Sequence, residues 1–364
     1  MYTSGLEKDL IPSYDRQDES SKNDRMSAGW MKRVLGAVSL VIATIILFVF
    51  LNFDLSCHPI NLSETRKAIV KRSGGSQSFV YNVDPSFYNI LTVYSQLDAN
   101  INVYFNHSDV NNVIQFNSNI TQSNSLDDSL IIVPRLSKNN NTNGATLFLE
   151  SADGKTTTGF NSTGSTVDVT ISVPCSVKLL KSLIVYIVNG QFENLSSTNS
   201  TTGLVINNLS ITGDTINVSA GGIVSKRVTI TSNKSAIEGS LSAGQSIDLV
   251  TISSTINPKI NHIDNIPPNQ YDLFTTETFS VSAKSRTGNI NLSLVSSNLA
   301  GNYSATSLNG KFGATVLPSF NLPLTTNWAQ YGVSGQFGSF PVTAARMSTV
   351  TVNNNFGDSF ISFV

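Results

Sequence analysis

The stretch Val281-Ser-Ala-Lys-Ser-Arg-Thr-Gly288-Asn-Ile290 contains the pattern that decides the fold of this 364-residue chain. Apolar or small residues alternate with polar ones along Phe279–Arg286, and a glycine precedes the next apolar residue by two positions. An alternation with a period of two is typical of a β-strand that has one buried face. We therefore expect Val281, Ile290 and, in a later repeat of the pattern, Phe312 to be buried, and Ser282 to face outward.

The same unit recurs from residue 183 to the end of the chain: apolar-x-apolar, a polar corner, a glycine or small residue, and an apolar residue two positions later. Its corners are Gly190, Gly213, Ser235, Ser254, Gly288, Gly310, Gly335 and Gly357, at steps of 23, 22, 19, 34, 22, 25 and 22 residues. A repeat of about 22 residues predicts a parallel β-solenoid in which each turn of the chain is one rung. The long step contains Asn257–Glu277, whose three prolines predict a loop inserted at one corner.

An antiparallel β-sandwich is the alternative fold. In that case Asn189-Gly190 and Asn309-Gly310 are two-residue hairpin turns. Either fold is mainly β, because short runs of β-branched and aromatic residues alternate with Gly, Asn and Ser from Phe79 onward.

A different kind of segment lies upstream, at Val34–Leu51, which has no charge, proline or amide. A helix of this length approaches the thickness of the hydrocarbon core of a bilayer, so we predict a transmembrane signal anchor over residues 34–53. A cleaved signal peptide fits less well, because its apolar region is shorter and begins nearer the N-terminus. Residues 1–33 are polar and predict a disordered tail, and residues 54–77 predict a juxtamembrane linker.

Basic residues indicate the orientation of the span. Lys32 and Arg33 directly precede it, whereas the first basic residue after it is Arg66. Basic flanks remain on the cytoplasmic side, so the tail is predicted inside and the C-terminal part outside the cell or in a lumen. The plasma membrane and the secretory or vacuolar membranes are equally compatible with this topology.

N-glycosylation motifs give independent support for that orientation. All twelve lie beyond the span, as a glycosylated outside domain requires. The acceptors are Asn61, Asn106, Asn119, Asn140, Asn161, Asn194, Asn199, Asn208, Asn217, Asn233, Asn291 and Asn302.

The linker contains a candidate processing site. Lys71 and Arg72 precede Ser73-Gly74-Gly75-Ser76, and a flexible backbone next to a basic pair suits a kexin-like protease. We expect cleavage after Arg72 to release the outside domain; otherwise the pair is part of a solvated stalk.

The sequence also resembles the putative-adhesin β-solenoid domain family, including its fungal membrane-anchored relatives. The resemblance rests on Val167-Asp-Val-Thr-Ile-Ser-Val-Pro174, on Leu183–Gly190 and on the repeated corners up to Gly357. It covers residues 167–364 and, more loosely, the preceding β region over residues 78–166. The family implies a stacked surface domain with an adhesive role and no catalytic residues. The many glycosylation motifs and the proline-rich insertion depart from the family pattern.

Little in the chain indicates catalysis or a cofactor. His58, His107 and His262 are far apart, and no phosphate loop, nucleophile elbow or zinc motif occurs. The adjacent pair Asp127-Asp128 is the one feature shared with β-helical glycosidases, which use clustered carboxylates. A formal net charge of −1 without a basic run excludes a nucleic-acid partner.

Two cysteines complete the set of candidate sites. Cys57 and Cys175 can pair with each other in an oxidising lumen, Cys57 can pair between chains, or both remain thiols. We conclude that the chain is a non-enzymatic, adhesion-like or structural surface protein. Its expected partners are the lipid bilayer through residues 34–53 and wall glycans, matrix glycans or another surface protein. A carbohydrate-active enzyme and a membrane-tethered stress-protection domain are the alternatives.

Overall fold

A computed structural model of the chain describes residues 76–108, 112–121, 131–151, 165–196, 203–263, 278–295, 299–317, 322–338 and 347–364. These residues belong to the compact unit Ser73–Val364 and form 22 strands and no helix. The prediction of a mainly β protein is therefore confirmed for them. They contain no helix that could cross a bilayer. The predicted tail, the predicted span and the linker as far as residue 75 lie outside the described residues.

The strands have the following bounds in chain order: β1 Ser76–Val83, β2 Ile90–Ser95, β3 Asn100–Ser108, β4 Ile114–Thr121, β5 Ile132–Asn139, β6 Gly144–Ser151, β7 Thr166–Pro174, β8 Leu179–Tyr186, β9 Asn189–Asn194, β10 Val205–Gly213, β11 Thr215–Ser219, β12 Val224–Ser232, β13 Ile237–Thr251, β14 Ile256–His262, β15 Ser280–Ser285, β16 Ile290–Val295, β17 Gly301–Ser307, β18 Phe312–Val316, β19 Asn327–Ala329, β20 Gly332–Phe337, β21 Ser348–Asn354 and β22 Ser359–Phe363.

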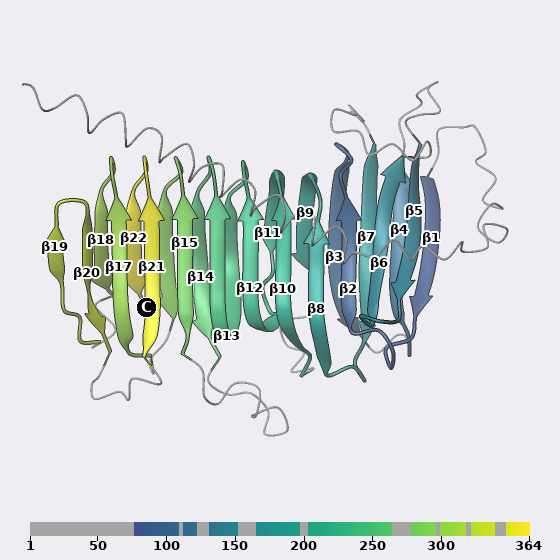
Figure 1. Cartoon of the computed structure of the whole chain (residues 1–364), viewed down its shortest axis with the longest axis horizontal. Helices are drawn as coiled ribbons and strands as arrows, with labels where there is room; N and C mark the ends of the chain where they lie inside the picture. The colour runs from purple at the N-terminus through teal and green to yellow at the C-terminus, as the bar shows by residue number, and fades with distance from the viewer. Residues whose placement is uncertain are drawn as a thin grey trace, which may run out of the picture. The chain divides into compact units, whose positions relative to one another are not determined.

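Two ladders of paired strands run along the unit (Figure 1). Ladder A has the order β5-β6-β2-β8-β10-β12-β13-β15-β21-β17-β20-β19. Ladder B has the order β1-β4-β7-β3-β9-β11-β13-β14-β16-β22-β18. The long strand β13 belongs to both, with its N-terminal part in ladder B and its C-terminal part in ladder A. From β8 to β18 the chain therefore passes alternately from one ladder to the other.

Pairing between these turns of the chain is parallel from β6 to β17 in ladder A and from β7 to β18 in ladder B. The strands that flank Asn189-Gly190 are β8 and β9, which pair with strands of other turns and not with each other. The same holds for β17 and β18, which flank Asn309-Gly310. The two hairpins of the sandwich alternative are therefore absent.

The order of the turns departs from their order in the sequence at both ends. The turn β2–β3 lies between β6–β7 and β8–β9, and the turn β21–β22 lies between β15–β16 and β17–β18. Beyond these turns the pairing becomes antiparallel, through β5, β4 and β1 at one end and β20 and β19 at the other. These antiparallel end strands cover the outer edges of β6, β7 and β17, which would otherwise be free to pair with other chains. Among the described strands, none pairs with the outer edge of β18.

Inward side chains of both ladders form one apolar core. Val281 and Ile290 are buried, as predicted, and Ser282 lies on the outward side. The prediction of a buried Phe312 was wrong: this residue is only half-buried, because β18 is the last described strand of ladder B. Burial of the apolar face is the main driving force for stacking these turns.

Glycine is required at the corner between β15 and β16. A Cβ atom on Gly288 would lie 1.6 Å from the carbonyl oxygen of Ser254 in the neighbouring turn. The Gly288 carbonyl accepts a 2.6 Å hydrogen bond from Nδ2 of the buried Asn354, and the Ser285 hydroxyl accepts one from the Gly288 amide at 2.9 Å. The small residue that recurs at corners in the sequence thus allows backbones of adjacent turns to touch.

Two details of the sequence interpretation were wrong. The predicted insertion Asn257–Glu277 starts too early, because Ile256–His262 forms β14 between β13 and β16. Pro258 faces inward there and lacks an amide, and the register with β16 contains no pair for it. The corner proposed at Gly335 lies instead within the antiparallel end strand β20.

Candidate functional site

An aromatic row on the outward side of ladder A is the strongest candidate site. Phe148 of β6, Tyr94 of β2 and Tyr186 of β8 are in register, with Arg135 of β5 opposite Phe148. Each aromatic residue lies between two buried neighbours in the sequence, so all three rings point outward. We call Arg135, Phe148, Tyr94 and Tyr186 the aromatic row.

The rings contact one another along the ladder. Tyr94 and Tyr186 are stacked, with centroids 5.0 Å apart and planes at 17°, whereas Phe148 meets Tyr94 edge-on at 5.8 Å and 65°. The Arg135 guanidinium carbon lies 5.5 Å from the Phe148 centroid, and an Nη atom is 3.1 Å from the Glu150 carboxylate. Stacking of this kind stabilises the pairing of the end turns.

One ring face of the row remains open. Tyr186 is 36 % exposed, and its neighbour on the side away from Tyr94 is the small Thr212 of β10. Ring edges of Tyr94 and Phe148 extend this partly exposed apolar strip. A ligand can therefore lie along the strip and cover the Tyr186 ring.

Hydroxyl and amide groups surround the strip. The next outward row contains Thr146, Thr92, Ile184, Ser210 and Thr229 in register. Burial, and then the neighbouring Tyr186, raises the pKa of Tyr94, an effect that the hydrogen bond from the Gln96 amide partly offsets. The Tyr94 phenol is thus neutral at physiological pH. Neutral hydrogen-bonding groups beside exposed rings suit a ligand that has hydroxyl groups and apolar C–H faces, which are the properties of a sugar.

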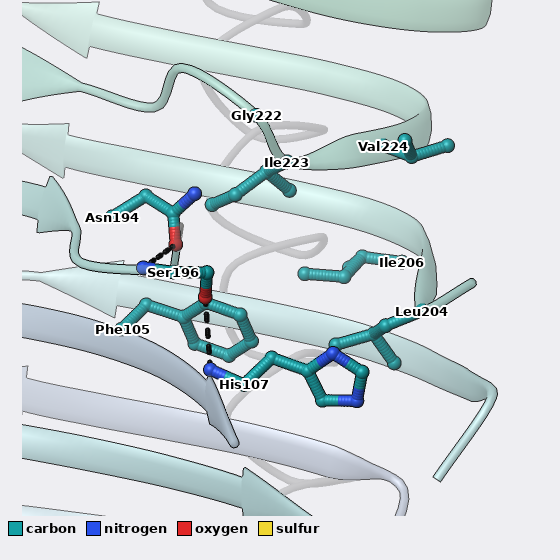
Figure 2. A pocket seen from close by; sticks show the side chains of 9 residues that line it. All are labelled: Phe105, His107, Asn194, Ser196, Leu204, Ile206, Gly222, Ile223 and Val224. Carbon is teal, nitrogen blue, oxygen red and sulfur yellow. Dashed lines mark hydrogen bonds between the residues drawn. The ribbon is translucent and has the colours of Figure 1, made fainter. Parts of the chain in front are cut away.

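A second candidate, the pocket in Figure 2, is too small for such a ligand. It lies where β3 and β9 approach the corner before β12, and its water-accessible volume is about 30 Å³. That space holds one or two water molecules. Its lining residues are Phe105, His107, Asn194, Ser196, Leu204, Ile206, Gly222, Ile223 and Val224.

Polar groups in the pocket maintain the local backbone. Asn194 Nδ2 donates a 2.7 Å hydrogen bond to the Gly221 carbonyl, and Asn194 Oδ1 accepts one from the Ser196 amide at 3.2 Å. The Ser196 hydroxyl accepts a 2.8 Å hydrogen bond from the His107 amide (Figure 2). His107 Nε2 lies 3.1 Å from the Pro174 carbonyl oxygen. The Asn194 amide, which is the acceptor of a predicted glycosylation motif, is therefore part of the fold.

The described glycosylation motifs fall into two groups. Those with half-buried acceptors are Asn106, Asn194, Asn208 and Asn233, and those with exposed acceptors are Asn119, Asn140, Asn217, Asn291 and Asn302. The amide groups of Asn208 and Asn233 donate to the Lys181 carbonyl and the Asp214 carboxylate, respectively. Asn61, Asn161 and Asn199 lie outside the described residues.

The two ladders differ in how many motifs they hold. Asn106, Asn119, Asn194, Asn217 and Asn291 all belong to strands of ladder B. The strands of ladder A contain two described motifs, that of Asn208 in β10 and that of the exposed Asn302 in β17. The outward side of ladder A is therefore the side with fewer sites for attached glycans.

Most of the remaining predicted sites lie outside the described residues. Cys175 is half-buried in the turn after β7, but Cys57 is not described, so their pairing stays a prediction. Lys71, Arg72, His58 and the Asp127-Asp128 pair are likewise outside the described residues. Among the described His, Cys, Asp and Glu residues, no group of three is placed to hold a metal ion.

Two carboxylates in the described part, Asp84 and Asp214, have pKa values below their ordinary value. Hydrogen bonds from the Ser86 side chain and amide lower the pKa of Asp84. A hydrogen bond from Lys234, whose Nζ is 2.6 Å away, lowers the pKa of Asp214. A glycosidase acid requires the opposite shift, so neither residue suits that role.

Comparisons with known proteins give remote likenesses only. No protein-family model matches the sequence. No curated protein matches it either. A putative cell adhesion protein from Clostridium sporogenes is 9 % identical over 80 % of this chain and 100 % of its own, with a TM-score of 0.32. Putative adhesins from Parabacteroides distasonis and Bacteroides fragilis are each 12 % identical, over 81 % and 80 % of this chain and 99 % of their own chains, with TM-scores of 0.34 and 0.30. These values are too low to assign a function.

Sequence reasoning missed the aromatic row. Tyr94, Phe148 and Tyr186 are separated by more than thirty residues from one another, and the order of their strands in space is β6, β2, β8. Each ring occupied an outward position of an alternating strand, which was a detectable signal. The sequence did not indicate, however, that β2 lies between β6 and β8, and so it did not show that the three rings are neighbours.

Proposed function

We propose that this protein is a non-enzymatic surface protein whose outside domain binds glycans through the outward side of ladder A. In this proposal residues 34–53 anchor the chain in a membrane, the N-terminal tail is cytoplasmic and residues 73–364 are outside and N-glycosylated. The domain is a β-solenoid with rungs of about 22 residues, akin to the fungal membrane-anchored relatives that its corner motifs resemble.

The observation that carries the proposal is the aromatic row with its exposed Tyr186 ring and the hydroxyl groups beside it. Aromatic side chains offer a large rigid contact area, and hydroxyl and amide groups beside them can satisfy the hydroxyl groups of a sugar. Extended polysaccharides of a wall or matrix suit a row that follows the stacking direction of the strands.

The location of the glycosylation motifs supports the choice of side. Attached glycans are bulky and keep the surface around them in solvent. Five described acceptors lie on strands of ladder B, against Asn208 and Asn302 on strands of ladder A, and none belongs to the aromatic row. Release of the domain by cleavage after Arg72 would leave this side unchanged, since the ladder begins downstream of that residue.

Binding to insoluble polysaccharides tests the proposal. The purified full chain is incubated with chitin, cellulose and β-1,3-glucan particles, and the depletion of protein from solution is measured. We expect binding to at least one of these polymers, weakened about tenfold by Tyr186→Ala, since a ring contact of about 1.4 kcal/mol corresponds to a factor of ten.

Tyr104→Ala is the matched control, because Tyr104 is an outward tyrosine of β3 in ladder B. It should change binding less than twofold. Equal losses for both variants, or no binding to any polymer, would contradict the proposal. Release of soluble sugars would favour the carbohydrate-active enzyme instead.

A further inference from the structure

The end of the unit that carries β19 has the form of a step. Ladder A continues beyond β17 with the antiparallel strands β20 and β19, whereas ladder B ends at β18 (Figure 1). Among the described strands, β18 pairs only with β22, and β19 pairs only with β20. At the ordinary spacing between strands, ladder A is about 10 Å longer than ladder B at this end.

Large apolar side chains are exposed on this step. Trp328 of β19 is 68 % exposed, although it is in register with the buried Val333 and therefore belongs to the inner side of its ladder. Its ring centroid lies 6.0 Å from that of the half-buried Phe312 in β18. Tyr331, in the turn between β19 and β20, is 50 % exposed, and Leu317, directly after β18, is 44 % exposed. We call Phe312, Leu317, Trp328 and Tyr331 the step surface.

Charge is nearly absent from the step. Lys311 is the only charged residue among the described residues between 311 and 338. Exposed edge strands usually carry charges that prevent pairing with other chains, and β19 has none. An uncharged apolar edge that natural proteins usually protect indicates an interaction surface.

We propose that the step surface binds a second copy of this chain, end to end. A two-fold axis parallel to the strands places the longer ladder A of one copy opposite the shorter ladder B of the other. The step is therefore complementary to itself. In that arrangement β19 of each copy adds to the free edge of β18 in the other, a strand addition that supplies backbone hydrogen bonds. Such a contact is isologous, as expected of a symmetric dimer.

The location of the step gives the pairing a role that rests on the proposed function. The chain enters the ladders at β1, and β1 and β19 lie at opposite ends of the array of strands (Figure 1). For a chain anchored through residues 34–53, end-to-end pairing through β19 joins copies from two facing membranes. The partner of this adhesion-like protein is then the protein itself.

Light scattering of the full chain in detergent solution tests the pairing. At about 10 μM, a micromolar interaction is largely formed, so we expect a dimer. Trp328→Asp should give a monomer, because it introduces two buried charges at each contact. Phe87→Asp is the matched control: Phe87 is 67 % exposed but lies in the turn after β1, and its variant should remain dimeric. Unchanged thermal transitions for both variants establish that they are folded.

Aggregation of cells that express the same three chains separates the two proposals. Loss of both the dimer and the aggregation with Trp328→Asp alone supports the end-to-end contact between membranes. A Trp328-dependent dimer without aggregation keeps the contact and refutes its role between membranes. A monomeric wild-type chain, or a dimer that survives Trp328→Asp, overturns the contact and leaves the polysaccharide assay of Tyr186 as a separate test of the proposed function.

Discussion

At the scale of single residues, Gly288 shows how the recurring corner is built. The carbonyl of Ser254 lies so close that any side chain at position 288 would displace a backbone, and the buried Asn354 fixes the same corner from the next turn. The sequence could therefore indicate which residues turn the chain, because close approach of backbones leaves a visible preference for glycine.

Replacement of Gly288 by alanine should destabilise the fold strongly. The added methyl group would lie 1.6 Å from the Ser254 oxygen, and we expect a loss of about 3 kcal/mol in the free energy of unfolding, at the upper end for overpacked sites. Gly221→Ala is the control, since the nearest atom to its added Cβ is 3.9 Å away. Urea unfolding of the two variants should differ clearly; equal stabilities would mean that the corners are not packed as described.

At the scale of strands, the alternation in the sequence predicted which side of a strand is buried but not where the strand lies. The inward Val281 and Ile290 are fully buried, whereas Phe312 at the end of ladder B is not. Turns of the chain that have similar length and the same alternation cannot be assigned a position in the stack from their own sequence. The insertion of β2–β3 and β21–β22 between other turns therefore depends on long-range packing and could not be predicted.

The difference between an interior and an end strand is measurable. Ile290→Ala should lower the free energy of unfolding by about 2–5 kcal/mol, because it leaves a cavity in the core. Phe312→Ala should cost less than the truncation of a fully buried phenylalanine, because Phe312 is only half-buried. Ser282→Ala, on the outward side of β15, should remain within about 0.5 kcal/mol of the parent. Chemical denaturation of the three variants checks this order; a larger loss for Ser282→Ala than for Ile290→Ala would mean that the strand is shifted by one residue.

At the scale of the whole molecule, the described unit consists of two ladders with different outward sides. Ladder B holds most of the described glycosylation motifs, and ladder A holds the aromatic row. The motifs were visible in the sequence because each is a local signal of three residues. Their segregation was not, because it depends on which strands alternate between the ladders.

The proposal as a whole requires that the unit lies outside the membrane with most of its glycans on ladder B and with the aromatic row of ladder A free of them. Mass spectrometry of glycopeptides from the full chain, expressed in a eukaryotic host, tests it most directly. We predict occupied sites at the exposed Asn119, Asn217 and Asn291 and an unmodified Asn194, whose amide is bonded to Gly221 within the fold. A chain without any glycan would contradict the outside placement. Glycans on Asn208 and Asn302 of ladder A, with Asn119, Asn217 and Asn291 unmodified, would contradict the assignment of the two sides.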